Sequence, residues 1–168
     1  MKNFNSQLIR QIGEHLVVAE LGRRGIIATP FAGNVPDIDI LAYRDGTSVP
    51  IQVKSLTKGA WSMGAERFIK ISWNGDTQIV EGLRSDIDRN LIYVCVVVGD
   101  KSGEERFFLL TQGELQHIIH DHYKAFLAKH GGVRPRNPQS THVGVQEEEL
   151  APHRDRWSLI ADQFAPKP

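Results

Sequence analysis

Residues 37–55, DIDILAYRDGTSVPIQVKS, decide the fold of this chain. Acidic and apolar residues alternate through DIDILAY, the residues RDG at 44–46 are typical of a tight turn, and VPIQVKS alternates again. Alternation at period two is the pattern of a half-buried strand, and a turn between two such runs makes a β-hairpin. The stretch therefore predicts two antiparallel strands, both partly buried.

Polar side chains share one face on each strand of this hairpin. Because side chains alternate between the two faces of a strand, Asp37 and Asp39 are expected to point the same way. The same rule places Gln52 and Lys54 together on one face of the second strand. The two polar pairs are therefore expected to converge.

The segment before the hairpin predicts a helix, a short strand and a loop. Apolar residues recur at three- and four-residue steps over 6–24, where Ser6 is placed to cap the start and Gly25 to close the end. IIATPF, residues 26–31, is typical of a strand that Pro30 cuts short, and AGNVP, residues 32–36, of a surface loop. A helix followed by three strands is therefore expected over the first 55 residues.

The segment after the hairpin alternates strands and helices around one buried strand. NLIYVCVVV at 90–98 is almost entirely apolar, which is typical of a strand covered on both faces. Thr111 with Glu114 matches a capping box and opens a helix that continues to about Lys129, before the breaker Gly131-Gly132. We also expect a loop at 59–66, strands at 67–72 and 106–110, and helices at 78–87 and 154–164.

These elements predict the mixed α/β class. Residues 1–130 are expected to form the main domain, and residues 131–168 an irregular connection plus a C-terminal helix packed on the same domain. Trp157, with Leu159, Ile160 and Phe164, is expected to anchor that helix to the domain or to a second subunit, so a homodimer is a hypothesis.

Composition limits the functions open to the chain. Lys plus Arg equals Asp plus Glu at 20 each, so a nucleic-acid partner would need a local basic surface. No apolar run approaches the length that spans a bilayer, and the N-terminus lacks the apolar segment of a secretory signal, so we expect a cytoplasmic protein. Cys95, the only cysteine, is expected to be a small buried hydrophobic residue.

The polar residues of the hairpin suit phosphodiester hydrolysis. That reaction needs a polarised phosphorus, an activated water and relief of charge on the leaving oxygen, which oxygen-ligated Mg²⁺ or Mn²⁺ can supply. Asp39 would ligate the metal, with the carbonyl oxygen of Gln52 as a weaker ligand and the backbone carbonyl of Val53 as another. Lys54 would orient the attacking water or help to deprotonate it.

The residues 36–42, PDIDILA, followed by 52–54, QVK, resemble the PD-(D/E)XK nuclease superfamily, which includes archaeal Holliday junction resolvases and Mrr-like restriction nucleases. The resemblance covers roughly residues 10 to 55. It implies a restriction endonuclease-like core, with a central mixed β-sheet flanked by helices in αβββαβ order. It also implies a Mg²⁺-dependent endonuclease that acts on DNA.

The resemblance also implies roles for individual residues. Those families place a glutamate on the first helix, which makes Glu14 the candidate ligand there, ahead of Gly25. Asp39 is favoured as the family's aspartate with Asp37 supporting it, although Asp37 supplies the literal PD. Gln52 stands where an acidic residue is usual, as in a QXK form, and its neutrality weakens the attraction for a divalent ion.

Two other hypotheses compete with the nuclease. The Gln52 departure also fits a nuclease-fold module that binds DNA or a protein without hydrolysis, because DID beside a turn and QVK are also ordinary solvated patterns. The other hypothesis is an interaction subunit whose partner supplies the basic surface. Six basic residues near the motif are candidates for phosphate contacts: Arg10, Arg23, Arg24, Lys58, Arg67 and Lys70.

Overall fold

A five-stranded mixed sheet forms the centre of the chain, which a computed structural model describes over residues 2–31 and 37–165. The strand order is β1-β2-β3-β7-β8, in which β3 and β7 are parallel and the other neighbours antiparallel. These strands are β1 (Ile27–Pro30), β2 (Ile40–Arg44), β3 (Thr47–Leu56), β7 (Ile92–Val97) and β8 (Arg106–Thr111). With helices on both faces of this sheet, the predicted mixed α/β class is confirmed.

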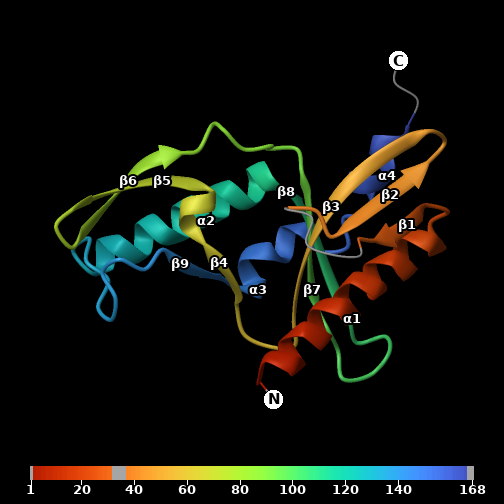
Figure 1. The fold of residues 1–168 in the computed structure, drawn as a ribbon, viewed down its shortest axis with the longest axis horizontal. Helices are drawn as coiled ribbons and strands as arrows, with labels where there is room; N and C mark the ends of the chain where they lie inside the picture. Colours follow the sequence, from red (N-terminus) through yellow and green to blue (C-terminus); the bar gives the residue numbers. More distant parts are fainter. Residues whose placement is uncertain (1, 32–36, 166–168) are drawn as a thin grey trace.

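Each face of the sheet has its own apolar core. α1 (Lys2–Arg23) packs on one face through Val17 and Leu21, together with Trp157, Ile160 and Phe164 from the C-terminal segment. The other face is covered by α2 (Gln112–Lys129) and by two small sheets. In Figure 1 the sheet and α1 occupy the right of the view, and α2 with the small sheets occupies the left.

One of the two small sheets pairs strands that follow each other in sequence, and the other pairs strands that are far apart in sequence. β5 (Ile69–Asn74) and β6 (Thr77–Leu83) form a hairpin, whereas β4 (Trp61–Gly64) pairs with β9 (His142–Val145). The short helices are η1 (Ala65–Arg67), α3 (Glu147–Leu150), η2 (Ala151–His153), α4 (Ser158–Ala161) and η3 (Asp162–Phe164). No helix among the described residues is long and apolar enough to cross a membrane.

Local sequence signals set several of these elements as expected. Asp45 and Gly46 both have positive φ, at 50° and 82°, and join β2 to β3 through the expected tight turn. The capping box of Thr111 and Glu114 opens α2 as predicted. Gly25, with φ of 71°, follows the end of α1, where Ile26 N–H donates to the carbonyl of Leu21.

Other expectations were wrong. Residues 78–87 are not a helix, because Thr77–Leu83 is β6 and pairs with β5. The two residues between these strands, Gly75 and Asp76, are a hairpin signal, and Gly75 has a positive φ of 60°. The second long helix, α2, follows β8, whereas the αβββαβ order placed a helix before the buried strand. Helix α1 begins at Lys2, so Ser6 lies inside it and is not its cap.

Two segments expected to be irregular contain regular structure. Residues 59–66 include β4, and residues 131–153 include β9 and α3. The strands β4 and β9 form because their backbone groups hydrogen-bond to each other, although the two segments are far apart in sequence. The loop predicted at 32–36, and Pro36 of the motif with it, lie outside the described residues.

Candidate functional site

The carboxylate of Asp39 lies where β2 stops pairing with β3. The backbone N–H of Asp39 donates to the carbonyl of Ile51 at 2.9 Å, just before β2 begins at Ile40. Two residues further along β3, the N–H of Val53 donates to Oδ2 of Asp39 at 2.7 Å. The side chain thus takes the place of a strand carbonyl, and this fixes the carboxylate beside the open edge of β3.

Gln52 holds the same carboxylate from the second side. Its Nε2 donates to Oδ2 of Asp39, and Gln52 is only 5% exposed. The amide nitrogen therefore faces Asp39, and the carbonyl oxygen that was expected to ligate a metal faces away. Both side-chain hydrogen bonds of Asp39 use Oδ2, and no residue of 2–31 or 37–165 hydrogen-bonds to Oδ1.

The backbone carbonyl of Val53 is directed at the same edge. Peptide groups alternate along a strand, so residues two apart point to the same neighbour. The carbonyl of Ile51 accepts from Asp39 on the β2 side, whereas that of Leu56 accepts from Val98 on the β7 side. By this alternation, Val53 C=O points past the end of β2, toward Asp39.

Helix α1 reaches the site because a glycine lets it pass close to β3. A Cβ built on Gly13 would lie 1.8 Å from Oγ of Ser55 and 2.7 Å from its Cβ, so a larger residue has no room. The next residue, Glu14, is half-buried. Burial raises the pKa of the Glu14 carboxyl, and the neighbouring charge of Asp39 raises it further, while Lys54 opposes the shift.

Lys54 completes this group of charges. Burial lowers the pKa of its ammonium group, Asp39 opposes that change, and Arg67 and Arg10 add to it. Lys54 and Gln52 alternate on β3 with Val53, so the first two face the core that contains Tyr93 and Cys95, while Val53 faces α1. Asp39 therefore hydrogen-bonds to Gln52 and has Lys54 and Glu14 as charged neighbours, the latter carried by α1.

The donor groups at this edge match the chemistry of a small hard cation. Within residues 2–31 and 37–165, no three His, Cys, Asp or Glu side chains are gathered as a metal cluster. The site instead offers two carboxylates that repel each other, from Glu14 and Asp39, and the carbonyl of Val53. Mg²⁺ is commonly held in proteins by one or two carboxylates while it keeps several waters, so these residues fit it.

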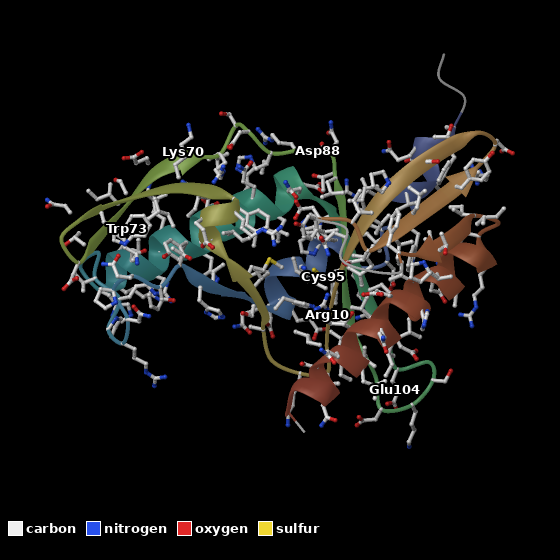
Figure 2. The ribbon with its side chains drawn as sticks, in the orientation of Figure 1. Arg10, Lys70, Trp73, Asp88, Cys95 and Glu104 are labelled. Atoms are coloured by element: carbon white, nitrogen blue, oxygen red, sulfur yellow. The ribbon has the colours of Figure 1, made fainter. Side chains whose placement is uncertain are left out.

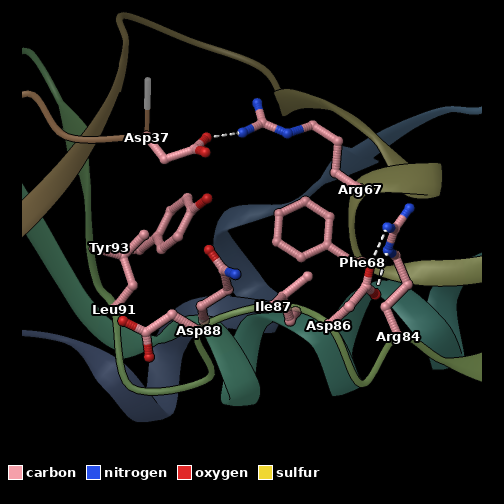
Figure 3. A pocket seen from close by; sticks show the side chains of 10 residues that line it. Asp37, Arg67, Phe68, Arg84, Asp86, Ile87, Asp88, Leu91 and Tyr93 are labelled. Carbon is pink, nitrogen blue, oxygen red and sulfur yellow. Dashed lines mark hydrogen bonds and ion pairs between the residues drawn. The ribbon is translucent and has the colours of Figure 1, made fainter. Parts of the chain in front are cut away.

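Asp37 does not join Asp39, contrary to the expectation that they share a strand face. Neither residue is in a strand. Asp37 has a φ of 63°, a left-handed backbone conformation in which side chains do not alternate as they do in a strand. Its carboxylate forms an ion pair with Arg67 (Figure 3). Asp37 is therefore a partner of Arg67 in this arrangement.

A pocket of about 360 Å³ opens next to the candidate site. In Figure 3 the Asp37–Arg67 pair lies along one side of it, Tyr93 and Phe68 flank it, and Asp86 and Asp88 lie opposite. Tyr93 is the neighbour of Gln52 across β3 and β7, and burial raises its pKa to about 12. No local pattern in the sequence predicts this pocket, because its lining comes from segments that only the fold brings together.

The basic residues near the motif do not gather at one place. Figure 2 shows Arg10 on α1, whereas Lys70 lies on the β5–β6 hairpin with Trp73. Arg23 and Arg24 both pair with Glu20. Among the six candidates, Arg10 and Arg67 are the ones whose charges reach Lys54.

Comparisons with known proteins give a likeness in structure. The sequence matches no family model, and it matches no curated protein. Among solved structures, the chain is similar to a bacterial homing endonuclease, I-Ssp6803I, with a TM-score of 0.49 and 14% identity over 94% of this chain and 93% of that one. At this level of similarity, the chemistry of this chain has to be argued from its own residues.

Proposed function

We propose that this chain is a Mg²⁺-dependent endonuclease that hydrolyses phosphodiester bonds of DNA. The observation that carries the proposal is the meeting of Glu14, Asp39 and Lys54, from three separate elements, at the open edge of β3. Two carboxylates beside a half-buried lysine suit the binding of a divalent cation and the activation of water.

Each residue has a part in the proposed reaction. Glu14, Asp39 and the Val53 carbonyl would hold Mg²⁺, which supplies polarisation of the phosphate and charge relief at the leaving oxygen. Gln52 positions the Asp39 carboxylate through its amide N–H, and its own oxygen becomes a further ligand only if the amide turns over. Lys54 orients the attacking water, and burial lowers the pKa of its ammonium group toward the range of a proton-transfer group.

Arg67 suits a contact with the substrate phosphate. Its guanidinium is half-exposed, and its charge acts on both Lys54 and Tyr93. In the protein alone it is paired with Asp37, which is also half-exposed. A phosphate that approaches Lys54 can take over Arg67 as a two-point acceptor, since guanidinium groups bind phosphate and carboxylate in the same geometry.

The test compares two lysines that are four residues apart. Lys54→Met should lower the rate of Mg²⁺-dependent cleavage of duplex or branched DNA by about 10²–10⁴-fold, which is the usual effect of losing a general acid or base. Mn²⁺ binding and DNA binding should remain. Lys58→Met removes the same charge from an exposed position and should leave the rate unchanged. Equal rates in Lys54→Met and the unaltered protein would reject this role of Lys54.

A second candidate function is a nuclease-fold module that binds DNA, or a protein partner, without cutting. The observation that favours it is the Gln52–Asp39 hydrogen bond, which satisfies one carboxylate oxygen without a cation. Binding of linear, branched and single-stranded DNA without cleavage of any of them in Mg²⁺ or Mn²⁺ would support this module and reject the enzyme.

A further inference from the structure

A second pocket, remote from the candidate metal ligands, is lined by basic and aromatic side chains. It has a volume of about 460 Å³ and lies between the end of α2 and the segment that leads into β9. Its ionisable lining residues are two arginines and two histidines, in a chain whose formal net charge is zero. The lining consists of Phe126, His130, Arg134, Pro135, Arg136, Asn137, Ser140 and His142.

The loop that carries the arginines is held in place by a buried polar network. Gln78, only 3% exposed, donates from its backbone N–H to the carbonyl of Gly132 at 2.9 Å. Its side-chain amide donates to the carbonyls of Pro138 and Ser140, and the hydroxyl of Tyr123 donates to its Oε1. The loop is thus fixed on both sides of the arginines, and little ordering remains to be done when a ligand binds.

Aromatic rings hold Arg134 by its flat face. Its guanidinium carbon lies 4.8 Å from the ring centroid of Phe126 and 5.4 Å from that of Tyr123. The ring of His130 packs on Phe126 with 4.7 Å between centroids. The Arg134 guanidinium also interacts with the hydroxyl of Tyr123, and its remaining N–H groups are available to an acceptor in the guanidinium plane.

The arginines of this pocket are not matched by acids. Most other arginines of the described chain pair with a carboxylate, as Arg106 does with Glu147. Arg134 and Arg136 form no ion pair with any residue of 2–31 or 37–165. The charge of Glu66 reaches Tyr123 behind the pocket, but Glu66 does not line it.

We propose that this pocket binds phosphate groups of the DNA backbone, at a distance from the bond that is cut. Two arginines on a fixed loop, flanked by histidines and free of lining carboxylates, match a phosphodiester in charge and in hydrogen-bond geometry. An overall neutral chain that holds a polyanion needs such a local basic surface. The inference rests on the proposed function in that the ligand is the same DNA.

The experiment measures binding of the full chain to a labelled DNA duplex in Ca²⁺ buffer over 50–200 mM salt. The variant Arg134→Gln/Arg136→Gln should bind more weakly at every salt concentration. Each lost phosphate contact lowers the slope of log K against log salt by about 0.9. From 50 to 200 mM salt, the affinity of the unaltered chain should therefore fall about tenfold more than that of the variant.

Two control variants separate charge and folding from a local contact. Arg44→Gln/Arg154→Gln removes two positive charges from ion-paired surface arginines and should keep the steep slope. Arg134→Lys/Arg136→Lys keeps the charge and should keep most of the slope, with weaker binding because the two-point geometry is lost. Circular dichroism of each variant confirms that it is folded.

Three results would overturn the proposal. The first is that the unaltered chain does not bind duplex DNA. The second is that Arg134→Gln/Arg136→Gln leaves the affinity and the slope unchanged. The third is that this variant loses binding to polyglutamate but keeps binding to DNA. The last result would assign the pocket to an acidic protein. Binding is measured in Ca²⁺, so it does not depend on cleavage. Binding that needs the two arginines, with no cleavage in Mg²⁺, would reject the nuclease but keep this inference. Cleavage in Mg²⁺, with binding that does not need the two arginines, would reject this inference but keep the nuclease.

Discussion

The contact between Gly13 and Ser55 gives a direct test of how the helix places Glu14. Gly13→Ala would put a Cβ 2.7 Å from Cβ of Ser55, whereas non-bonded carbon atoms prefer about 3.5–4.0 Å. Helix α1 would have to move away from β3 by roughly 1 Å to make room. Because Glu14 is the next residue, its carboxylate would move with the helix.

The expected loss of stability is the difference between two effects. Alanine in place of glycine inside a helix stabilises by about 1 kcal/mol, and overpacking of a close contact costs about 1–3 kcal/mol. We expect Gly13→Ala to lower the free energy of unfolding by up to about 2 kcal/mol, or Tm by up to roughly 8 °C for a chain of this size. A misplacement of about 1 Å at Glu14 can also lower cleavage by about 100-fold.

The assay is thermal unfolding of four variants, with cleavage measured in parallel. Gly22→Ala, on the same helix with no atom within 4 Å of the new Cβ, should be neutral or stabilising by up to about 1 kcal/mol. Ser55→Gly removes both clashing atoms, including an Oγ that has no hydrogen-bond partner in the described chain. Combined with Gly13→Ala, it should restore about 1–3 kcal/mol relative to the sum of the single changes. Additive effects, or a Gly13→Ala protein as stable as Gly22→Ala, would refute the reasoning.

Three further predictions concern the site and the core. Gln52→Glu should lower Tm in EDTA, because a second negative charge would face Asp39, and Mg²⁺ should raise the Tm of this variant more than that of the unaltered protein. If Mg²⁺ raises the Tm of neither protein, the metal site is contradicted. Asp37→Asn should release Arg67 and strengthen DNA binding at low salt without weakening Mn²⁺ binding; weaker Mn²⁺ binding would instead make Asp37 a ligand. Cys95 should resist alkylation at pH 8 until the protein unfolds, because burial raises its pKa to about 12 and keeps the thiol protonated; rapid labelling of folded protein would show an exposed thiol.

The sequence was most informative where the signal is carried by neighbouring residues. The alternation in β2 and β3, the Asp45-Gly46 turn and the capping box at Thr111 each depend on backbone preferences within a few residues, so they could be predicted. The Gly75-Asp76 turn is the same kind of signal. The expected helix over 78–87 did not take this turn into account, and the pairing of β6 with β5 makes that segment a strand.

The sequence by itself determined which residues could share a strand face, and thus Gln52 and Lys54 as a pair. Only the tertiary structure decided that Glu14 reaches Asp39, because that depends on how closely α1 passes Ser55. It also separated Asp37 from Asp39, through one positive φ and an ion pair formed 30 residues away. The physical reason is that periodicity acts over a few residues, whereas packing and long-range ion pairs depend on segments that meet only in the folded chain.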